Sequence, residues 1–257
     1  MGNSVATRAV VRLAATSEQS HGNEKPRSAG IHAQLRALAN ASRAAALQRF
    51  FKTGAGEYGA GDLFLGVSVP VLRRLARAHS ELALPDVAAL LRSRWHEERL
   101  LALLILGRQY ARAKPRQREA IYRLYLKSRL LVNNWDLVDC SAEHIRRAHL
   151  QDGDRATLQR LAASPCIWDR RMAVIATFHY IKRGDYRETF RLARLLLKDP
   201  HDLVQKAVGW MLREVGKRDQ AVAEAFLRRY AAQMPRTMLR NAIERFPARL
   251  RRRYLAA

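Results

Sequence analysis

The most informative segment of the chain is Asn133-Asn134-Trp135-Asp136-Leu137-Val138-Asp139. Asn134 is a favourable N-cap for a helix, because its side-chain oxygen can accept a hydrogen bond from an unpaired amide of the first turn. Asp136 then falls in that first turn, where the helix dipole favours a carboxylate. The segment therefore predicts a helix that begins at Trp135.

Two neighbouring faces of this predicted helix differ in character. Trp135 and Asp139 are four residues apart, so they share one face, one turn above the other. The adjacent face is an apolar stripe that would anchor the helix in a core, made of Val138, Ala142, Ile145 and Ala148. We therefore expect an indole and a carboxylate side by side, next to a buried seam, in a chain that is otherwise strongly basic.

Helical periodicity extends over most of the chain on both sides of this segment. Apolar residues recur at threes and fours from Ile31 to Lys52, and again almost without pause from Val69 onward. Breaks at Pro and Gly predict helices over residues 69–79, 84–93, 96–112, 115–129, 135–149, 154–163, 166–183, 185–198, 202–216, 219–231, 234–243 and 247–255. No stretch has the β-branched alternation of a strand.

The spacing of these helices predicts the architecture. Paired helices recur about every 35–40 residues, which is the range of HEAT-like repeats. The expected fold is all-α, a curved α-solenoid of degenerate HEAT-like helical repeats whose concave face could grip a rod. Residues 30–257 would form one domain, and residues 1–29 a flexible N-terminal tail with a short helix near residues 10–14. The Gly-rich segment 53–62 lacks the Gly-Lys-Ser/Thr of a phosphate-binding loop, and we expect it to be an ordinary interhelical loop.

Composition points to a polyanionic partner. The chain has 257 residues, 47 Lys+Arg against 23 Asp+Glu, a net charge of +24 and a sequence pI of about 11.2. DNA, RNA or an acidic membrane would suit that charge, while the 48% of apolar residues is enough for a sizeable core. Self-repulsion at this charge favours a monomer.

Several classes of protein are disfavoured. No apolar run approaches the ~20 residues of a membrane span, and the N-terminus lacks the apolar core of a secretory signal. Cys140 and Cys166 are the only cysteines and form no Cys-x-x-Cys pair. The sequence therefore predicts a cytoplasmic protein without a metal site. If DNA is the polyanion, we expect the protein to be nucleoid-associated when bound to it, with no membrane partner and no cofactor.

Two further segments carry candidate ligand-binding residues. In Ile167–Val174, Arg170 and Arg171 point roughly 100° apart, so one could face a ligand while the other is solvated, or both could be plain basic surface. In Asp199–Lys217, one face combines an indole with three cations, namely Lys206, Trp210, Arg213 and Lys217. Trp210 could fill the core or face a ligand, and Gly209 beside it would allow close approach of a helix or a ligand.

Further basic stripes fall on the later helices: Arg187, Arg191, Arg194 and Lys198; Arg236 and Arg240; and Arg249 to Arg253. One such stripe is usually a solvated face, but several on successive helices of a solenoid would form a track for phosphates. No motif for reading base edges is present, so we expect contacts to backbone and shape rather than sequence.

A carboxylate on a phosphate-binding surface weakens binding unless positive charge develops beside it. Cleavage of a C1′–N glycosidic bond develops such charge on an oxocarbenium-like sugar. Asp139 could stabilise that cation and orient the attacking water, while Trp135 and Trp210 present π faces to a cationic nucleoside. The alternative for Asp139 is a structural salt bridge to Arg170 or Arg171.

At these residues the chain resembles the AlkD family of DNA alkylation repair glycosylases, all-helical proteins of HEAT-like repeats. The resemblance covers roughly residues 35–255 and rests on Phe64-Leu65-Gly66-Val67 with Val69-Pro70, Asn134–Asp139, Trp168–Arg171 and Gln205–Trp210. It implies excision of cationic N3- and N7-alkylated purines, such as N3-methyladenine and N7-methylguanine, from duplex DNA. In this family the lesion stays stacked instead of being flipped into a pocket, against the general rule.

The resemblance also implies roles for particular residues. The catalytic aspartate falls on Asp139, the two sugar-contacting tryptophans on Trp135 and Trp210, and the active-site arginine on Arg171, with Arg170 as the alternative by a shift of one. Cations that contact DNA fall on Arg213 and Lys217, and Lys206 and Arg170 join them as expected DNA-binding residues. Leu203 and Val204 stand where the family would have an aromatic residue before Trp210.

Two rival hypotheses remain open from the sequence. The first is a non-catalytic HEAT-repeat module that binds nucleic acid or an acidic protein, in which Trp135 contributes only to stability. The second is lyase chemistry through a Schiff base, which requires a buried lysine of lowered pKa; Lys206 is the only nearby lysine that could serve.

Overall fold

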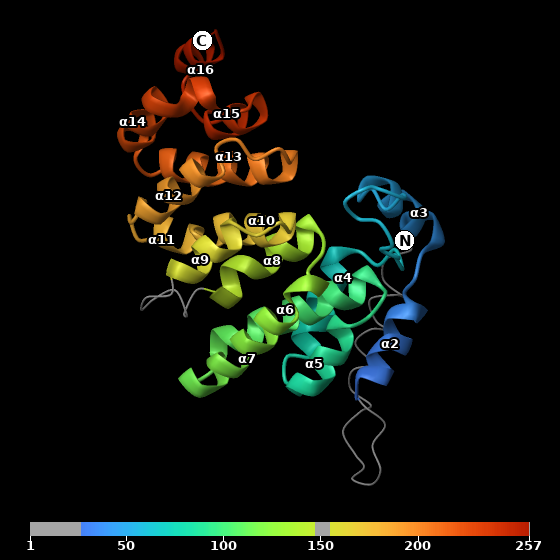
Figure 1. Ribbon diagram of the computed structural model, residues 1–257. Helices are drawn as coiled ribbons and strands as arrows, with labels where there is room; N and C mark the ends of the chain where they lie inside the picture. The colour runs from blue at the N-terminus through green and yellow to red at the C-terminus, as the bar shows by residue number, and fades with distance from the viewer. Residues whose placement is uncertain (1–26, 147–154, 257) are drawn as a thin grey trace.

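The computed structural model describes residues 27–146 and 155–256, and within them the secondary structure is helical (Figure 1). The only β-type pairing in the described part is a single bridge between Leu63 and Trp95. The all-α expectation is therefore confirmed. The short helix expected near residues 10–14 lies outside the described residues.

The described helices are α2 (Arg27–Ala37), α3 (Ala41–Phe50), α4 (Val69–Ala78), α5 (Leu84–Leu91), α6 (His96–Arg112), α7 (Pro115–Lys127), α8 (Trp135–Arg146), α9 (Arg155–Ala162), α10 (Ile167–Ala176), α11 (Phe178–Ile181), α12 (Arg187–Leu195), α13 (Asp202–Gly216), α14 (Gln220–Tyr230), α15 (Arg236–Ala242) and α16 (Ala248–Ala256). Two short 3₁₀ turns, Arg129–Leu131 and Ala231–Gln233, follow α7 and α14.

Two stretches that periodicity predicts as continuous are interrupted. Asn40 divides residues 31–52: its Oδ1 accepts from Arg43 N at 2.8 Å, and its backbone N–H donates to Leu65 O at 2.8 Å. Thr177 divides residues 166–183, where its hydroxyl donates to Val174 O at 2.7 Å and competes with the helix ladder. Side-chain caps and a tertiary contact, which leave no trace in hydrophobic spacing, end these helices.

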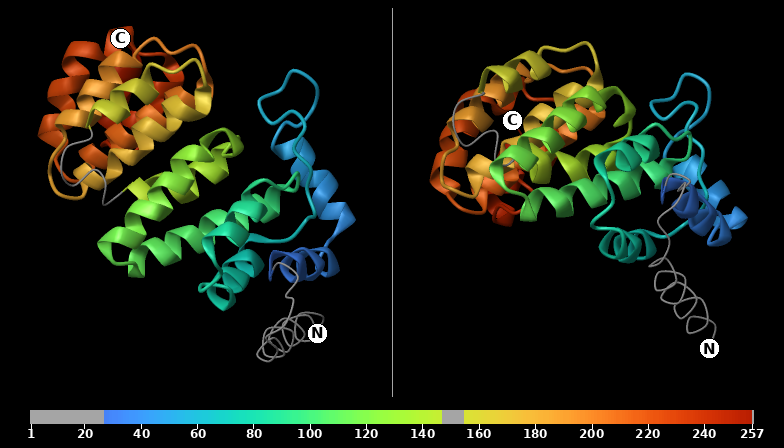
Figure 2. Two further views of the ribbon diagram at one scale, coloured as in Figure 1. Left: turned by 60° about the horizontal axis from the view of Figure 1, so that its bottom comes forward. Right: turned by 90° about the horizontal axis from the view of Figure 1, so that it is seen from below.

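Six helices form a central row in which each packs on the next: α4, α6, α8, α10, α13 and α15. Helices α5, α7, α9, α12 and α14 pack against members of this row. The stack curves, with α3 and the loop after it on one arm and the helices from α13 onward on the other (Figure 2). The stripe on α8 is buried as expected at Val138 and Ala142; the side chains of Ile145 and Ala148 lie outside the described part.

Close approaches hold two parts of this stack together. A Cβ on Gly209 of α13 would lie 2.5 Å from Met238 O, so the glycine lets α15 pack against α13. Gly66 has φ 79°, and a Cβ there would lie 2.1 Å from Asn40 O. Glu97, at the start of α6, accepts from the amides of Leu65, Gly66 and Val67 at 2.9, 2.7 and 3.2 Å. The segment before α4 is thus fixed to both α3 and α6.

None of the helices in the described residues combines the length and the apolarity needed to cross a bilayer.

Candidate functional site

The candidate site begins at the N-terminus of α8. The sequence predicted correctly that this helix starts at Trp135. Asn134 is fully buried, and its Oδ1 accepts from Trp135 N at 2.8 Å, so the expected cap is present at the first amide. Asp136 follows in the first turn and accepts from Leu137 N at 2.8 Å. This start fixes the two residues that share a face further along, Trp135 and Asp139.

Asp139 is held by a two-pronged ion pair with Arg171 of α10. Arg171 Nε donates to Oδ1 at 2.8 Å and Nη2 donates to Oδ2 at 2.7 Å, the fork geometry that suits a carboxylate. The Asp139 side chain nevertheless keeps 22% of its surface exposed, against 7% for Arg171. The carboxylate therefore has a fixed orientation and one side open to a ligand.

Burial raises the pKa of Asp139 above its ordinary value, because desolvation outweighs the stabilisation that Arg171 gives the carboxylate. The negative charge of Asp136, one turn earlier, adds to the rise. A carboxylate that is buried enough to be raised in pKa, yet paired with a cation, is well suited to interact strongly with positive charge that develops beside it.

Trp135 is embedded in aromatic side chains from α3 and the loop that follows. Phe51 stacks on its ring at 5.1 Å and 21°, and Phe50 meets it edge-on at 5.9 Å. The indole N–H hydrogen-bonds the hydroxyl of Tyr58, whose ring meets Trp168 of α10 edge-on at 5.9 Å. Burial raises the pKa of Tyr58, so the hydroxyl stays protonated and its oxygen accepts from the indole.

A buried charge network lies beneath this aromatic group. His96 contacts Asp62 through Nδ1 at 2.9 Å and Asp136 through Nε2 at 2.8 Å, while its ring stacks on Phe64 at 4.5 Å. Burial alone would lower the pKa of His96, but its hydrogen bonds and proximity to both carboxylates raise it to about 9. His96 is therefore an imidazolium that joins the segment before α4 to the first turn of α8.

Arg99 and two asparagines complete the network. Arg99 Nη2 donates to Asp62 Oδ1 at 2.5 Å and to Asn133 Oδ1 at 3.2 Å. The amide of Asn134 donates to Asp62 Oδ2 at 3.3 Å. Burial opposes the charge on Asp62, yet His96, Arg99 and Asn134 hold its pKa below the usual value. The start of α8 is thus anchored by hydrogen bonds to Asp136 and to the two asparagines before the helix.

Trp210 stands further along the row, on α13. Arg171 links this helix to the site, because Nη1 donates to Leu203 O. Trp210 follows Leu203 by seven residues, or about 10 Å along the helix axis. Its side chain is half-buried and packs against the core. The structure thus brings Asp139, Trp135 and Arg171 together and puts Trp210 on the next helix but one.

The expected DNA-binding cations all have protein partners. Arg170 donates to Asp199 Oδ2 at 2.7 Å and to two backbone carbonyls, those of Ser164 and Pro165, both at 2.9 Å. With its side chain only 13% exposed, Arg170 ties α10 to the connection between α12 and α13 and has little capacity left for DNA. Of the two arginines, the one beside Asp139 is Arg171.

The other three cations lie on α13 or directly after it, and each pairs with a carboxylate. Lys206 Nζ is 2.8 Å from Asp202, Lys217 Nζ is 2.8 Å from Glu214, and Arg213 pairs with Glu244. Lys206 and Asp202 are both exposed, and an exposed pair contributes about 0–1 kcal/mol, so a phosphate could replace that carboxylate. In the other two pairs one partner is shielded from solvent, because Glu214 is buried and Arg213 is half-buried.

Sequence reasoning missed the residues that come from far along the chain. The Gly-rich segment was expected to be an ordinary loop. Its Tyr58 hydrogen-bonds Trp135, and its Asp62 hydrogen-bonds His96. A signal was present in the run His96-Glu97-Glu98-Arg99, because four polar residues at the start of an otherwise apolar helix need buried partners. Among the described residues, no group of three or more His, Cys, Asp and Glu side chains could hold a metal ion.

Comparison with known proteins gives two findings. A family model described as DNA alkylation repair enzyme matches residues 31–246, which is most of the chain. A solved structure from Enterococcus faecalis, described as a predicted DNA alkylation repair enzyme, superposes with a TM-score of 0.62 at 15% identity, over 82% of this chain and 97% of that one. The second finding is a likeness of fold. No curated protein matches the sequence.

Proposed function

The chain belongs to the DNA alkylation repair enzyme family, and we propose on that premise that it is a monofunctional DNA glycosylase. Its substrates would be cationic alkylated purines in duplex DNA, with N3-methyladenine and N7-methylguanine as the expected lesions. The reaction is hydrolysis of the N-glycosidic bond and needs no cofactor.

The observation that carries this proposal is the environment of Asp139. It is a partly exposed carboxylate, fixed by two hydrogen bonds from Arg171 and flanked by Trp135 on the same helix face, in a chain of net charge +24. Such a group repels phosphates, so its value lies in attracting positive charge. The charged lesion and the oxocarbenium-like sugar both supply that charge.

The chemistry proposed for the site is simple. A water oxygen attacks C1′ while the C1′–N bond breaks, and the bonding electron pair neutralises the positive charge of the departing base. The base leaves neutral, so no general acid is required. Asp139 stabilises the cationic sugar in the transition state and orients the water, whose proton passes to the carboxylate or to solvent.

Aromatic residues would hold the nucleoside beside this carboxylate. Trp135 and Trp210 offer π faces to the cationic nucleoside. Tyr58 positions Trp135 through the bond to its indole. We propose that the lesion stays stacked in the duplex, and that Lys206, Arg213 and Lys217 exchange their carboxylate partners for phosphates when DNA binds.

We further propose that the stacked helices are a solenoid of degenerate HEAT-like repeats, with Asp139 on its concave side. The protein would act as a monomer in the cytoplasm, associated with the nucleoid when bound to DNA, and would have no membrane partner. Lyase chemistry is not part of the proposal, because Lys206 is exposed and paired with Asp202.

Incubation with methylated duplex DNA, followed by chromatography of the released bases, tests the proposal. We expect N7-methylguanine and N3-methyladenine to appear faster than in the enzyme-free control. The rival is a non-catalytic nucleic-acid-binding scaffold, for which the Asp139–Arg171 pair would be only a structural bridge. It predicts binding to the same DNA with no free base above the control.

A further inference from the structure

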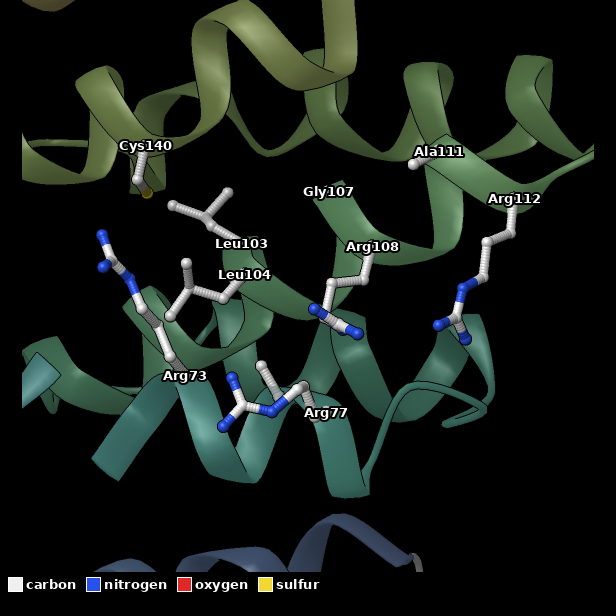
Figure 3. A pocket seen from close by; sticks show the side chains of 10 residues that line it. Arg73, Arg77, Leu103, Leu104, Gly107, Arg108, Ala111, Arg112 and Cys140 are labelled. Carbon is white, nitrogen blue, oxygen red and sulfur yellow. The ribbon is translucent and has the colours of Figure 1, made fainter. Parts of the chain in front are cut away.

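A groove between α4 and α6, closed at one end by α8, lies outside the residues discussed so far (Figure 3). Its volume is about 370 Å³. Four arginines line it, together with small and apolar residues: Arg73, Arg77, Arg108, Arg112, Ala76, Leu103, Leu104, Gly107, Ala111 and Cys140. We call it the arginine groove.

No carboxylate lines the arginine groove, so its charge is not neutralised from within. Arg73 and Arg77 are exposed, and Arg108 has a buried Nε without a hydrogen-bond partner in the described part of the chain. Arg112 has one distant acidic neighbour, Glu81, at 3.9 Å with both side chains largely exposed. Figure 3 shows Arg108 directed from α6 toward α4, and Arg73 directed toward Cys140.

This groove differs from the cationic positions on α13. Lys206, Arg213 and Lys217 each already contact a carboxylate. An anion that binds them must displace that partner, whereas the lining of the arginine groove contains no carboxylate that an anion would have to displace. Guanidinium groups also match phosphate oxygens better than ammonium groups do, because their donors form a planar fork.

The groove adjoins the candidate site through α8. Cys140 follows Asp139 directly in the sequence, and the charge of Arg73 reaches the Cys140 thiol. Burial, together with Asp136 and Asp139, raises the pKa of that thiol, which therefore stays neutral and adds no repulsion toward an anion. The helices concerned, α4, α6 and α8, are consecutive members of the central row.

We propose that the arginine groove binds backbone phosphates of one DNA strand beside the lesion, and that it supplies sequence-independent affinity. This inference rests on the proposed function only for the identity of the anion as DNA. Arg73 and Arg77, one helical turn apart on α4, and Arg108 on α6 would contact the phosphates from two sides. Each phosphate neutralised releases counterions, so affinity should fall steeply with salt.

The test compares two double variants of equal charge. In Arg73→Gln/Arg77→Gln both changed residues are exposed in the groove; in the control, Arg116→Gln/Arg123→Gln, both are exposed on α7, which carries none of the residues expected to contact DNA. The dissociation constant for a short undamaged duplex is measured over a range of salt concentrations. The salt slope is the slope of the logarithm of the binding constant against the logarithm of the salt concentration. The groove variant should reduce its magnitude by about 2, and the control should reduce it by much less. Equal slopes for the two variants would overturn the proposal.

A variant that keeps every charge separates groove occupancy from general electrostatics. Ala111→Phe places a ring at an exposed position of the groove and should weaken duplex binding at unchanged thermal stability. Pyrophosphate serves as a small-anion probe. If it raised the melting temperature of the wild type and not of the groove variant, while the salt slope for DNA stayed the same in both, the groove would be a small-ligand site and the proposal would be wrong.

Failure of this inference and failure of the glycosylase proposal are distinguishable. If the groove variant lowers the salt slope of duplex binding while the wild type releases no base, the groove proposal is supported and the glycosylase proposal is wrong. If the wild type releases base while the groove variant keeps the wild-type salt slope, the glycosylase proposal is supported and the groove proposal is wrong.

Discussion

Arg171 determines how the carboxylate of Asp139 is presented, since it makes two hydrogen bonds to it and a third to α13. Arg170, the preceding residue, makes an equally close pair with Asp199 outside the site. The two arginines therefore form a natural comparison, with the same charge, the same helix and the same type of partner.

Replacement of Arg171 by Gln should slow N7-methylguanine release by roughly tenfold at neutral pH, from loss of charge-assisted hydrogen bonds that fix the carboxylate. It should also raise the pKa of Asp139 further, because the cation that opposes the effect of burial is gone. Asp139 acts ionised, so the rate falls as pH drops through its pKa, and this acid limb should move to higher pH. Arg170→Gln is the control; the same movement of the limb in that variant would contradict the account.

Tyr58→Phe should reduce release by about fivefold, the effect of one lost hydrogen bond of roughly 1 kcal/mol. The phenyl ring would keep its contact with Trp168, but the indole of Trp135 would lose its acceptor. Single-turnover release measures the effect, and Tyr186→Phe, at the start of α12, provides the control. Equal rates for Tyr58→Phe and the control would remove Tyr58 from the site.

The spacing of residues along α8 predicted one feature of the candidate site. Trp135 and Asp139 are neighbours because residues four apart share a helix face, and that follows from the sequence alone. The sequence alone could not show whether Arg170 or Arg171 pairs with Asp139, because that depends on which part of the fold lies opposite each arginine. Tyr58 was missed for a similar reason, since only the tertiary structure brings the Gly-rich loop to α8.

At the level of elements, the start of α8 is fixed by a buried imidazolium between two carboxylates. His96 bridges Asp62 and Asp136, and Asp62 also binds Arg99 and both asparagines before α8. Removal of one member of such a network leaves the others as buried unpaired charges.

This network gives the free energy of unfolding a defined pH dependence. The pKa of His96 is raised from its usual 6.5 to about 9, so its stabilising effect is complete below about pH 6.5 and is lost as pH rises through 9. Denaturant unfolding should show a loss of up to about 3 kcal/mol over this window. His96→Gln should flatten that part of the curve.

His79→Gln is the matched control for this measurement. Burial lowers the pKa of His79, so its titration lies below the window. If the wild type and His96→Gln lost stability in parallel between pH 6.5 and 9, the proton on His96 would not be what stabilises the start of α8.

Two glycines of similar conformation should respond very differently to Ala. Gly66 and Gly184 have φ of 79° and 76°, but a Cβ on Gly66 would lie 2.1 Å from Asn40 O while one on Gly184 meets nothing within 4 Å. Gly184→Ala should cost about 1 kcal/mol, the penalty of the left-handed conformation. Gly66→Ala should exceed about 3 kcal/mol, because backbone must move as well. Equal melting temperatures for the two variants would show that the contact with α3 is dispensable.

Most helices were predictable, and the exceptions have a common cause. Hydrophobic period and the Pro and Gly breaks place α4, α6, α7 and α13 within a few residues of their observed ends, and α8 at its observed start. Periodicity failed at Asn40 and Thr177, where a polar side chain takes over a backbone hydrogen bond. A hydrophobic pattern carries no information about such bonds.

Over the whole molecule, the cations behind the net charge of +24 differ in whether a carboxylate neutralises them. The cations of α13 are paired with carboxylates, whereas the arginine groove has none in its lining. The sequence predicted a polyanionic partner correctly in kind, as the family match to DNA alkylation repair enzymes supports. It could not identify the free cations, because pairing depends on contacts between helices far apart in sequence.

The most direct measurement is the rate of N7-methylguanine release by Asp139→Asn and by Asp199→Asn. Each removes the carboxylate charge that pairs with an arginine of α10, Arg171 in one case and Arg170 in the other, so Asp199→Asn controls for the loss of an Arg–Asp pair. We predict that Asp139→Asn binds methylated duplex as the wild type does but releases the base at least about a hundredfold more slowly, while Asp199→Asn keeps the wild-type rate. Equal release by Asp139→Asn and the wild type would show that this carboxylate is a structural bridge and not the catalytic group.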